Sequence, residues 1–538
     1  MLPSNQDDSK PASYSFQGRI YGALVAHIGK FCGFHQTQAL VQQQEQQKEQ
    51  KGDENAEISL ENEETDTAEE LEEDNEKGED NDEDSHPRCD WKTIDAIPHS
   101  RYEELVALTC TFTEGPLKPT KVLAQEKGTF NAVSIVGVIT RGKCDKYIVR
   151  VPGHATVAHW TAQDAYMMQR EIDIIEYIRK NTSAPVPQIC TYSTDFANVL
   201  GHPFIMMTML PGKSAFSAWF DEDFEESEDT DFTLNFRFGD LPSPVVEKKR
   251  LTLLCSLARI MAEINKLSFN EIGMPNIPID GSTTTSIGPL YQWDNTGSDA
   301  FSERLSLSTT ADFVSERPTL RSNKSETQLG MLKLLDMIFS QPVFDAPSST
   351  AETFTLHHAD LDLQNILVDE AGNVTGIIDW DRCVAVPRCV GASSAPLFLQ
   401  KDWMPSYLNN LATAPYMTFT TDRYRQMYAA ALAEQGCPDA KYTTKSAMYQ
   451  AGIMALYDHD GGDTMDFLAK VLRCIPEFRG RVDEVLMAFG LGWPTGEAIV
   501  RQHLVKIFES ELPDMNILQN AETDIAATDW MLDFQYEV

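Results

Sequence analysis

The first patterned stretch of the chain is rich in β-branched and aromatic residues and predicts antiparallel strands. Phe130–Val138 (FNAVSIVGV) and Lys146–Val151 (KYIVRV) are separated by the turn-prone segment Thr140–Asp145. A second pair follows at Ile189–Ser193 and Pro203–Met209. The pattern therefore predicts a β-rich region before residue 210.

Apolar residues at helical spacing predict helices elsewhere. Ala162–Lys180 shows this spacing and must end before the prolines of TSAPVP, which forbid its continuation. Leu253–Ile264 indicates a core helix, and helical patterns run from Asp422 to about Glu509. Residues 281–327 are rich in Ser and Thr without periodicity, which predicts long loops. A short strand-rich island at 353–380 interrupts the helical part.

Acidic residues are concentrated in two places. Residues 45–84 hold 20 Asp or Glu against 3 Lys, and residues 221–231 add 8 acidic residues and no basic one. A segment of this composition cannot bury enough apolar surface to offset its ordering entropy, so residues 36–88 are predicted to be a disordered linker. A protein partner for this acidic segment is the alternative. The folded chain is expected to begin near Trp91.

The charge that remains bears on the partners of the folded part. The whole chain has a net charge of −38, of which the two acidic stretches carry −25 and the rest −13. This balance argues against binding nucleic acid or anionic lipid through phosphate contacts. Ile20–Phe31 is too short and too polar to span a bilayer, so no stable membrane insertion is expected.

Cysteine usage and the N-terminus indicate an intracellular protein. The 10 cysteines are scattered without a Cys-x-x-Cys pair, which suits reduced structural thiols rather than zinc or redox motifs. Met1–Lys10 is acidic before it is basic, unlike a standard mitochondrial presequence. We therefore expect a cytoplasmic location, with mitochondrial association left open.

The strand-rich island carries the candidate chemistry. It places His358-Ala359-Asp360 before Asn365, then a strand, the turn EAGN, and a second strand that ends in Asp379. The hairpin returns Asn365 and Asp379 to the same end. A carboxylate at Asp360 could accept a proton from a hydroxyl, while the oxygens of Asn365 and Asp379 are hard donors suited to Mg²⁺. The alternative is that both aspartates only cap turns.

These residues resemble a known family. His358-x-Asp360-x-x-x-x-Asn365, followed by Ile377-Ile378-Asp379-Trp380, is similar to the aminoglycoside phosphotransferase and choline-kinase branch of the protein-kinase-like fold. The longer match resembles fungal phosphotransferase-family proteins, one subgroup of which is named for altered mitochondrial inheritance. The resemblance covers about Thr120–Ser510.

The resemblance assigns roles to the matching residues. It implies an α+β bilobal fold with a β-rich N-lobe and a mainly helical C-lobe. Asp360 would be the catalytic base, and Asn365 and Asp379 would hold Mg²⁺. His358 would brace the catalytic loop, with direct chemistry as the alternative.

The same resemblance implies the ATP site. Gly128 to Asn131 lies where the family covers the phosphates, before the first predicted strand, and an ordinary turn is the alternative. Arg150 takes the place of the kinase lysine and would pair with Glu171, which could otherwise be a solvated helix charge. Met209 lies where the family has the backbone hinge that binds adenine.

The domain boundaries follow from the composition and the resemblance together. They are an N-terminal segment at 1–35 with a short helix, the acidic linker at 36–88, the N-lobe at 89–210, the C-lobe at 211–510 with the acidic insert at 221–231, and a tail at 511–538.

Two functions from different classes follow. The first is an ATP- and Mg²⁺-dependent phosphotransferase acting on the hydroxyl of a small molecule, whose acidic surroundings would suit a cationic acceptor. The second is a catalytically impaired pseudokinase that acts as a binding protein, which Arg150 in place of lysine favours.

Overall fold

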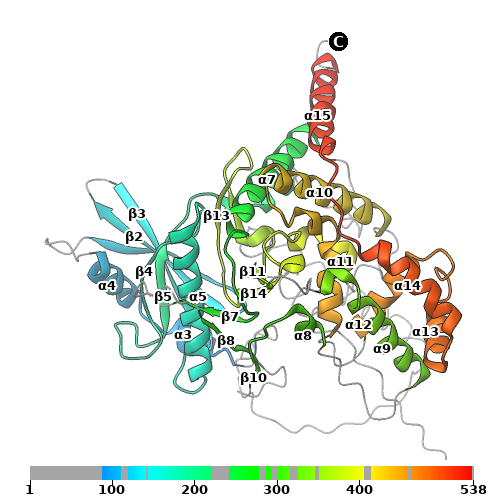
Figure 1. Ribbon diagram of the computed structural model, residues 1–538. Helices are drawn as coiled ribbons and strands as arrows, with labels where there is room; N and C mark the ends of the chain where they lie inside the picture. The colour runs from blue at the N-terminus through cyan, green and yellow to red at the C-terminus, as the bar shows by residue number, and fades with distance from the viewer. Residues whose placement is uncertain are drawn as a thin grey trace, which may run out of the picture.

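The structure of the protein is a computed structural model. It describes residues 86, 88–110, 119–140, 143–220, 242–277, 286–293, 301–315, 325–345, 351–404, 414–456 and 462–535. The predicted N-terminal segment, the acidic linker up to residue 85 and the insert 221–231 lie outside these residues. The described chain forms a sheet-rich N-terminal region and a largely helical C-terminal region (Figure 1), which confirms the predicted α+β class.

One antiparallel sheet with strand order β1-β2-β3-β5-β4 forms the N-terminal region. Its strands are β1 (Thr120–Lys127), β2 (Asn131–Thr140), β3 (Lys143–Pro152), β4 (Ile189–Ser193) and β5 (Phe204–Thr208). The last four match the predicted strands to within a few residues. Strand β1 was not predicted, because its sequence TKVLAQEK is mostly polar and never fully buried. Arg150 lies on the central strand, opposite Val133 of β2 and Ile205 of β5.

Helix α5 (Ala162–Asn181) lies beside this sheet (Figure 1). It begins with a capping box in which Thr161 and Asp164 satisfy each other's backbone N–H groups. Ile172 is buried in a cluster with residues of β5, and Glu171 precedes it on the buried side. Packing of the helix against the sheet therefore carries the Glu171 carboxylate toward β3.

The first described helix begins at Trp91, near which the folded chain is expected to begin, and Arg88 before it is also packed. Two helices, α3 (Trp91–Asp95) and α4 (His99–Cys110), precede the sheet. Arg88, which the sequence analysis places in the disordered linker, is 1% exposed and pairs with Asp164 of α5 at 2.8 Å. A buried guanidinium needs such a partner. The partner lies 76 residues further on, so no local pattern could reveal it.

Helices form most of the C-terminal region. They are α6 (Phe216–Trp219), α7 (Pro244–Ile264), α8 (Thr310–Ser315), α9 (Glu326–Phe339), α10 (Ala414–Glu434), α11 (Ala440–Leu456), α12 (Gly462–Arg473), α13 (Val482–Leu491), α14 (Pro494–Phe508) and α15 (Asn516–Gln535). The predicted core helix is part of α7. Gly436, with φ of 72°, follows α10 as a left-handed residue that ends a helix. Within the described chain, none of the helices has the length and apolarity needed to cross a bilayer.

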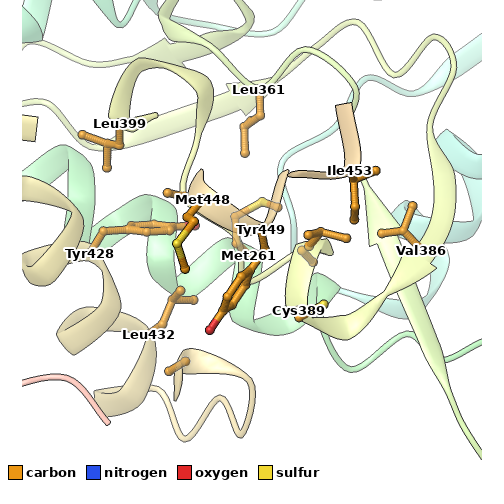
Figure 2. Packing of buried hydrophobic residues seen from close by; sticks show 14 of the residues in the cluster. Met261, Leu361, Val386, Cys389, Leu399, Tyr428, Leu432, Met448, Tyr449 and Ile453 are labelled. Carbon is orange, nitrogen blue, oxygen red and sulfur yellow. The ribbon is translucent and has the colours of Figure 1, made fainter. Parts of the chain in front are cut away.

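The largest apolar core lies among these helices. Figure 2 shows Met261 of α7, Tyr428 and Leu432 of α10, and Met448 and Tyr449 of α11 packed together. Burying apolar side chains of this size stabilises a fold by about 1.5–3 kcal/mol each. The core thus gives the loops on its surface a rigid base.

Short strand pairs lie between the sheet and the helices. Strand β11 (Phe354–His357) pairs with β14 (Val384–Pro387), and β12 (Ile366–Val368) pairs with β13 (Val374–Ile377). Strand β6 (Lys213–Ser214) adds to the edge of β12. The predicted hairpin is therefore confirmed.

The predicted long loops at 281–327 are in part wrong. The structure places strands β8 (Ser286–Gly288), β9 (Leu290–Trp293) and β10 (Phe301–Arg304) there, together with α8. Elements of three to six residues are too short to show a period, which is why the pattern missed them.

Candidate functional site

The loop after β11 holds the Asp360 carboxylate in place. The Asn365 side-chain amide donates to Asp360 Oδ2 at 2.9 Å and to the Asp360 carbonyl oxygen at 2.8 Å. Gln364 Nε2 donates to the same Oδ2 at 3.1 Å. Both amides converge on one oxygen, which leaves Oδ1 unused by them. The carboxylate is thus oriented and keeps an acceptor atom for another group.

Burial is the main influence on the acidity of Asp360. Together with the negative charges of Asp362 and Asp379, burial raises the pKa of Asp360 to about 6, although Gln364 and Asn365 oppose the shift. A carboxylate with this pKa is mostly ionised at neutral pH and binds a proton more strongly than an ordinary aspartate. It has the properties of a general base.

His358 connects the loop to the end of the hairpin. Its Nδ1 accepts from the Asp360 N–H at 3.2 Å, and its Nε2 lies 3.0 Å from the Ile378 carbonyl oxygen. Because Nδ1 accepts, the ring proton is on Nε2, which donates to Ile378. The ring packs edge-to-face on Trp380 at 4.6 Å. Burial lowers the pKa of His358, so a neutral ring that braces the loop fits this geometry better than direct chemistry.

Asp379 follows the second hairpin strand in an unusual conformation. Its φ is 61°, in the left-handed region that few non-glycine residues adopt, although aspartate tolerates it better than most. The Ile378 N–H donates to the Asn365 carbonyl oxygen at 3.0 Å, which fixes the residue before Asp379. The side chain of Asp379 stays 41% exposed and its Oδ1 lies 3.4 Å from Arg150 Nη1.

Arg150 joins the two regions of the molecule. Its Nη2 donates to Glu171 Oε2 of α5, and its Nη1 reaches Asp379, 229 residues later in the chain. Burial lowers the pKa of Arg150, but Glu171 and Asp379 outweigh this and raise it. Burial also raises the pKa of Glu171, while the guanidinium of Arg150 opposes that shift and favours the ionised carboxylate.

The Arg150–Glu171 pair has unused hydrogen-bonding capacity. Arg150 Nε and Glu171 Oε1 are buried and have no hydrogen-bond partner among the described residues. Buried polar atoms are rarely left in this state. The guanidinium also carries charge toward the exposed carboxylate of Asp379. The pair thus keeps a donor and an acceptor unused by the described residues, next to a carboxylate that solvent can reach.

Gly128 to Asn131 forms the turn between β1 and β2. The sequence analysis places this turn before the first strand, and the structure corrects this because β1 precedes it. The Gly128 N–H donates to the Asn131 carbonyl oxygen at 2.8 Å. Asn131 pairs with Pro152, two residues beyond Arg150 on β3. The turn therefore lies near the Arg150 end of that strand.

Met209 lies toward the other end of β3. It follows β5, its N–H donates to the Lys146 carbonyl oxygen at 3.2 Å, and it is 37% exposed. Lys146 is four residues before Arg150, which corresponds to about 13 Å along a strand. The turn at Gly128 and the Met209 backbone thus lie on opposite sides of Arg150 along β3.

Sequence reasoning missed two residues of the site. Gln364, which orients Asp360, lies inside the Asp360-x-x-x-x-Asn365 motif, so its amide next to the asparagine was a readable signal. Asp362 is buried, accepts from the Leu363 N–H at 2.8 Å and adds charge near Asp360. Its alternation with Asp360 in the sequence ADLDLQN was the signal for it.

The donor set can be compared with what metals require. Among the described residues, no group of three or more His, Cys, Asp or Glu side chains could hold a metal ion by itself. A Mg²⁺ ion bound through phosphates and water needs only one or two protein oxygens. Asn365 and Asp379 supply an amide and a carboxylate of this hard type.

Known structures similar to this chain include phosphotransferases and kinases. A macrolide 2'-phosphotransferase type I is 14% identical, with 76% of this chain and 98% of that chain covered and a TM-score of 0.30. A thermostable mutant of an aminoglycoside phosphotransferase, in ternary complex with AMP-PNP and hygromycin B, is 14% identical, with 72% and 99% covered and a TM-score of 0.32. A choline kinase from Cryptosporidium parvum is 12% identical, with 75% and 97% covered and a TM-score of 0.28.

Comparison of sequences gives a more specific result. No curated protein sequence matches the chain. A family model does match, over a segment that includes Asp360, Asn365 and Asp379. The resemblance inferred from the catalytic-loop motif is therefore confirmed, and residues 244–426 of this chain match the phosphotransferase enzyme family, APH.

Proposed function

We propose that the protein transfers the γ-phosphate of ATP to a hydroxyl group of a small molecule. The observation that carries the proposal is the convergence of Asp379 with Arg150 and Glu171, from the hairpin, β3 and α5, beside an oriented Asp360. The hairpin lies 229 residues after Arg150 in the chain, and together these side chains supply the charges that phosphoryl transfer requires.

Asp360 is the proposed base for the acceptor. With Oδ2 held by Gln364 and Asn365, Oδ1 can accept the hydroxyl proton as the oxygen attacks phosphorus. Its pKa of about 6 keeps it ionised at neutral pH and makes it a better proton acceptor than an ordinary aspartate. Most of the catalysis would come from positioning and from charge neutralisation.

The proposed nucleotide site lies along β3. Arg150, held by Glu171, would contact the phosphates through Nη1, which faces the exposed carboxylate of Asp379. The turn from Gly128 to Asn131 would cover the phosphates, and the backbone at Met209 would face the adenine. Arginine suits this place because its planar fork can contact a carboxylate and a phosphate together.

Asn365 and Asp379 would hold the magnesium ion. When bound, Mg²⁺ would neutralise charge on the phosphate oxygens. The carboxylate of Asp379 fits this role because it is 41% exposed, so an ion can reach it from solvent.

The acceptor is proposed as a small molecule with a hydroxyl group, and the negative charge around the site would favour a cationic one. A cytoplasmic location is part of the proposal, and the nine described cysteines, all free thiols, agree with a reducing compartment. Neither nucleic acid nor a membrane is part of the proposal.

Calorimetry with ATP, with and without Mg²⁺, tests the nucleotide site. The wild type should bind ATP only with Mg²⁺, and Asp379→Asn should abolish the metal-dependent part. The matched control is Asp369→Asn, because Asp369 lies in the turn of the same hairpin but outside the site. Absence of Mg²⁺-dependent binding at millimolar ATP in the wild type would contradict the proposal and support the pseudokinase alternative.

A screen for phosphate transfer tests the catalytic part. Variants of candidate acceptors with and without a hydroxyl group should separate substrates from non-substrates. Asp360→Asn should keep Mg²⁺-dependent ATP binding and lower kcat by about 10²–10⁴-fold, the usual contribution of a general base. If Asp360→Asn left kcat unchanged, Asp360 would not be the base.

A further inference from the structure

Two β-hairpins outside the proposed site lie against helix α5. The first pairs β7 (Met274–Asn276) with β8, and the second pairs β9 with β10. They belong to the C-terminal part of the chain, yet Figure 1 shows β7 and β8 next to α5 of the N-terminal region. None of their residues has a role in the proposed chemistry.

The hairpins contact α5 through directional polar groups. Tyr166 Oη donates to the Pro289 carbonyl oxygen at 3.2 Å, and its ring meets Tyr291 edge-on at 5.4 Å. Arg170 Nη1 donates to Asn276 Oδ1. Hydrogen bonds are directional, so these contacts specify the orientation of the helix relative to the hairpins.

The two contacting side chains support each other on the helix. The Arg170 guanidinium lies over the Tyr166 ring at 5.2 Å and pairs with Asp173 at 2.8 Å. Residues four apart share one face of a helix, so Tyr166 and Arg170 form one surface. Arg170 is also the immediate neighbour of Glu171.

The hairpins are tied at their other end to the strands that carry the catalytic loop. Gly273 and Ala385 of β14 exchange backbone hydrogen bonds of 3.1 and 2.8 Å. Phe269 and Phe354 of β11 exchange bonds of 2.9 and 2.8 Å. Strand β11 leads into Asp360, and β14 follows Asp379 closely. Residues 269–276 and 286–291 thus connect α5 with the strands on either side of Asp360 and Asp379.

We propose that these hairpins act as a brace that holds Glu171 of α5 on Arg150 in register with Asp379. Tyr166 and Arg170 are then positioning residues, which act through Glu171 and touch no substrate. This inference rests on the proposed function, because it assigns the brace to the Arg150–Glu171–Asp379 arrangement.

Gly288 allows the brace to be disturbed at one point. A Cβ added there would lie 2.2 Å from Tyr166 Oη, so the tyrosine must move, and Gly288 has no positive φ that would strain an alanine. Gly288→Ala therefore breaks the Tyr166 contact. Tyr166→Phe removes only the hydrogen bond to Pro289 and serves as a second, milder variant. Arg179→Ala is the control, since Arg179 is exposed on the same helix and pairs only locally with Glu176.

Hydrogen exchange and kinetics together test the brace. Gly288→Ala should speed amide exchange across Ala162–Asn181 and lower kcat roughly ten- to a hundredfold, the scale expected for a displaced positioning group, with an unchanged acceptor KM. Tyr166→Phe should give the same changes at smaller size, and Arg179→Ala should give neither. Unchanged exchange in α5 with Gly288→Ala would overturn the brace.

A double variant separates positioning from general loss of structure. In a Glu171→Gln background, Gly288→Ala should lower kcat little further, because what it positions is already lost. Multiplying effects would overturn the positioning role. If the wild type transfers no phosphate to any acceptor, the proposed function fails, while the exchange measurement still decides whether the hairpins hold α5.

Discussion

Two arginine–carboxylate pairs hold helix α5, and they differ in how completely their polar atoms are used. At the first turn, Arg88 meets Asp164 with two hydrogen bonds of 2.8 and 3.2 Å and also donates to the His159 carbonyl oxygen. Asp164 accepts further bonds from the Thr161 N–H and hydroxyl. In the middle of the helix, Arg150 meets Glu171 and leaves a buried nitrogen and a buried oxygen without partners among the described residues.

The difference separates a pair whose bonds are saturated from the pair that we propose takes part in the site. Burial would raise the pKa of Asp164, but His154, Arg88 and Thr161 hold it well below its usual range. Burial raises the pKa of Glu171 despite Arg150. A pair with saturated bonds stabilises the fold, whereas a pair with spare capacity and an exposed neighbour, Asp379, can take a ligand.

The largest expected effect comes from breaking the saturated pair. Arg88→Met should lower the free energy of unfolding by about 3–5 kcal/mol, because it removes two of the hydrogen bonds that compensate the buried charge of Asp164. Thermal and denaturant unfolding measure this loss. Since the pKa of Asp164 is lowered in the fold, the stability that the pair provides is present above the ordinary aspartate pKa and fades as the pH falls below it.

Lys92→Met is the control for this change, because Lys92 is exposed and lies only four residues away. It should leave unfolding within about 0.5 kcal/mol of the wild type. If Arg88→Met were as stable as the wild type, Arg88 would belong to the linker and not to the packed fold.

Breaking the Arg150–Glu171 pair should instead lower activity more than stability. Arg150→Met should lower kcat by about 10²–10³-fold, as removal of a transition-state donor does, with a stability loss of only about 1–2 kcal/mol. The loss is smaller because Glu171, with its raised pKa, can take up a proton in place of its partner. Kinetics and unfolding on the same variant check both parts. A stability loss equal to that of Arg88→Met, with normal kcat, would make this pair structural too.

The sequence predicts some of the residues in this comparison and misses others. The Asp360, Asn365 and Asp379 spacing lies within 20 residues, and a hairpin signal between them was enough to bring them together. The strand KYIVRV placed Arg150 in the sheet because its β-branched residues are contiguous. Local patterns of this kind identify helices and strands. The loop of Asp360 and Asn365 could be predicted because its residues are close together in the sequence.

The parts that sequence reasoning missed depend on contacts between distant segments. The buried guanidinium of Arg88 pairs with Asp164 of α5, 76 residues later, and the acidic stretch that precedes Arg88 in the sequence concealed this. The hairpins at β7 to β10 gain their order from α5 and β14 rather than from their own Ser- and Thr-rich sequence. Non-local pairing leaves no period in a sequence, so it must come from a structure.

The smallest expected effect is a pH dependence set by Asp360. Below pH 6, kcat/KM should fall about tenfold per pH unit, because the proton on Asp360 must leave before it can accept one from the substrate. Above that value the rate should level off. Asp362→Asn should shift the fall of kcat/KM to lower pH, because the charge of Asp362 raises the pKa of Asp360. Asparagine can still accept the hydrogen bond from the Leu363 N–H. The small residual rate of Asp360→Asn should not fall in this way below pH 6. A fall that persisted in this variant would come from the nucleotide or from Glu171. The two carboxylates can then be compared by measuring stability and activity against pH. Protonation of Asp164 should lower stability in acid, whereas protonation of Asp360 should lower activity closer to neutral pH.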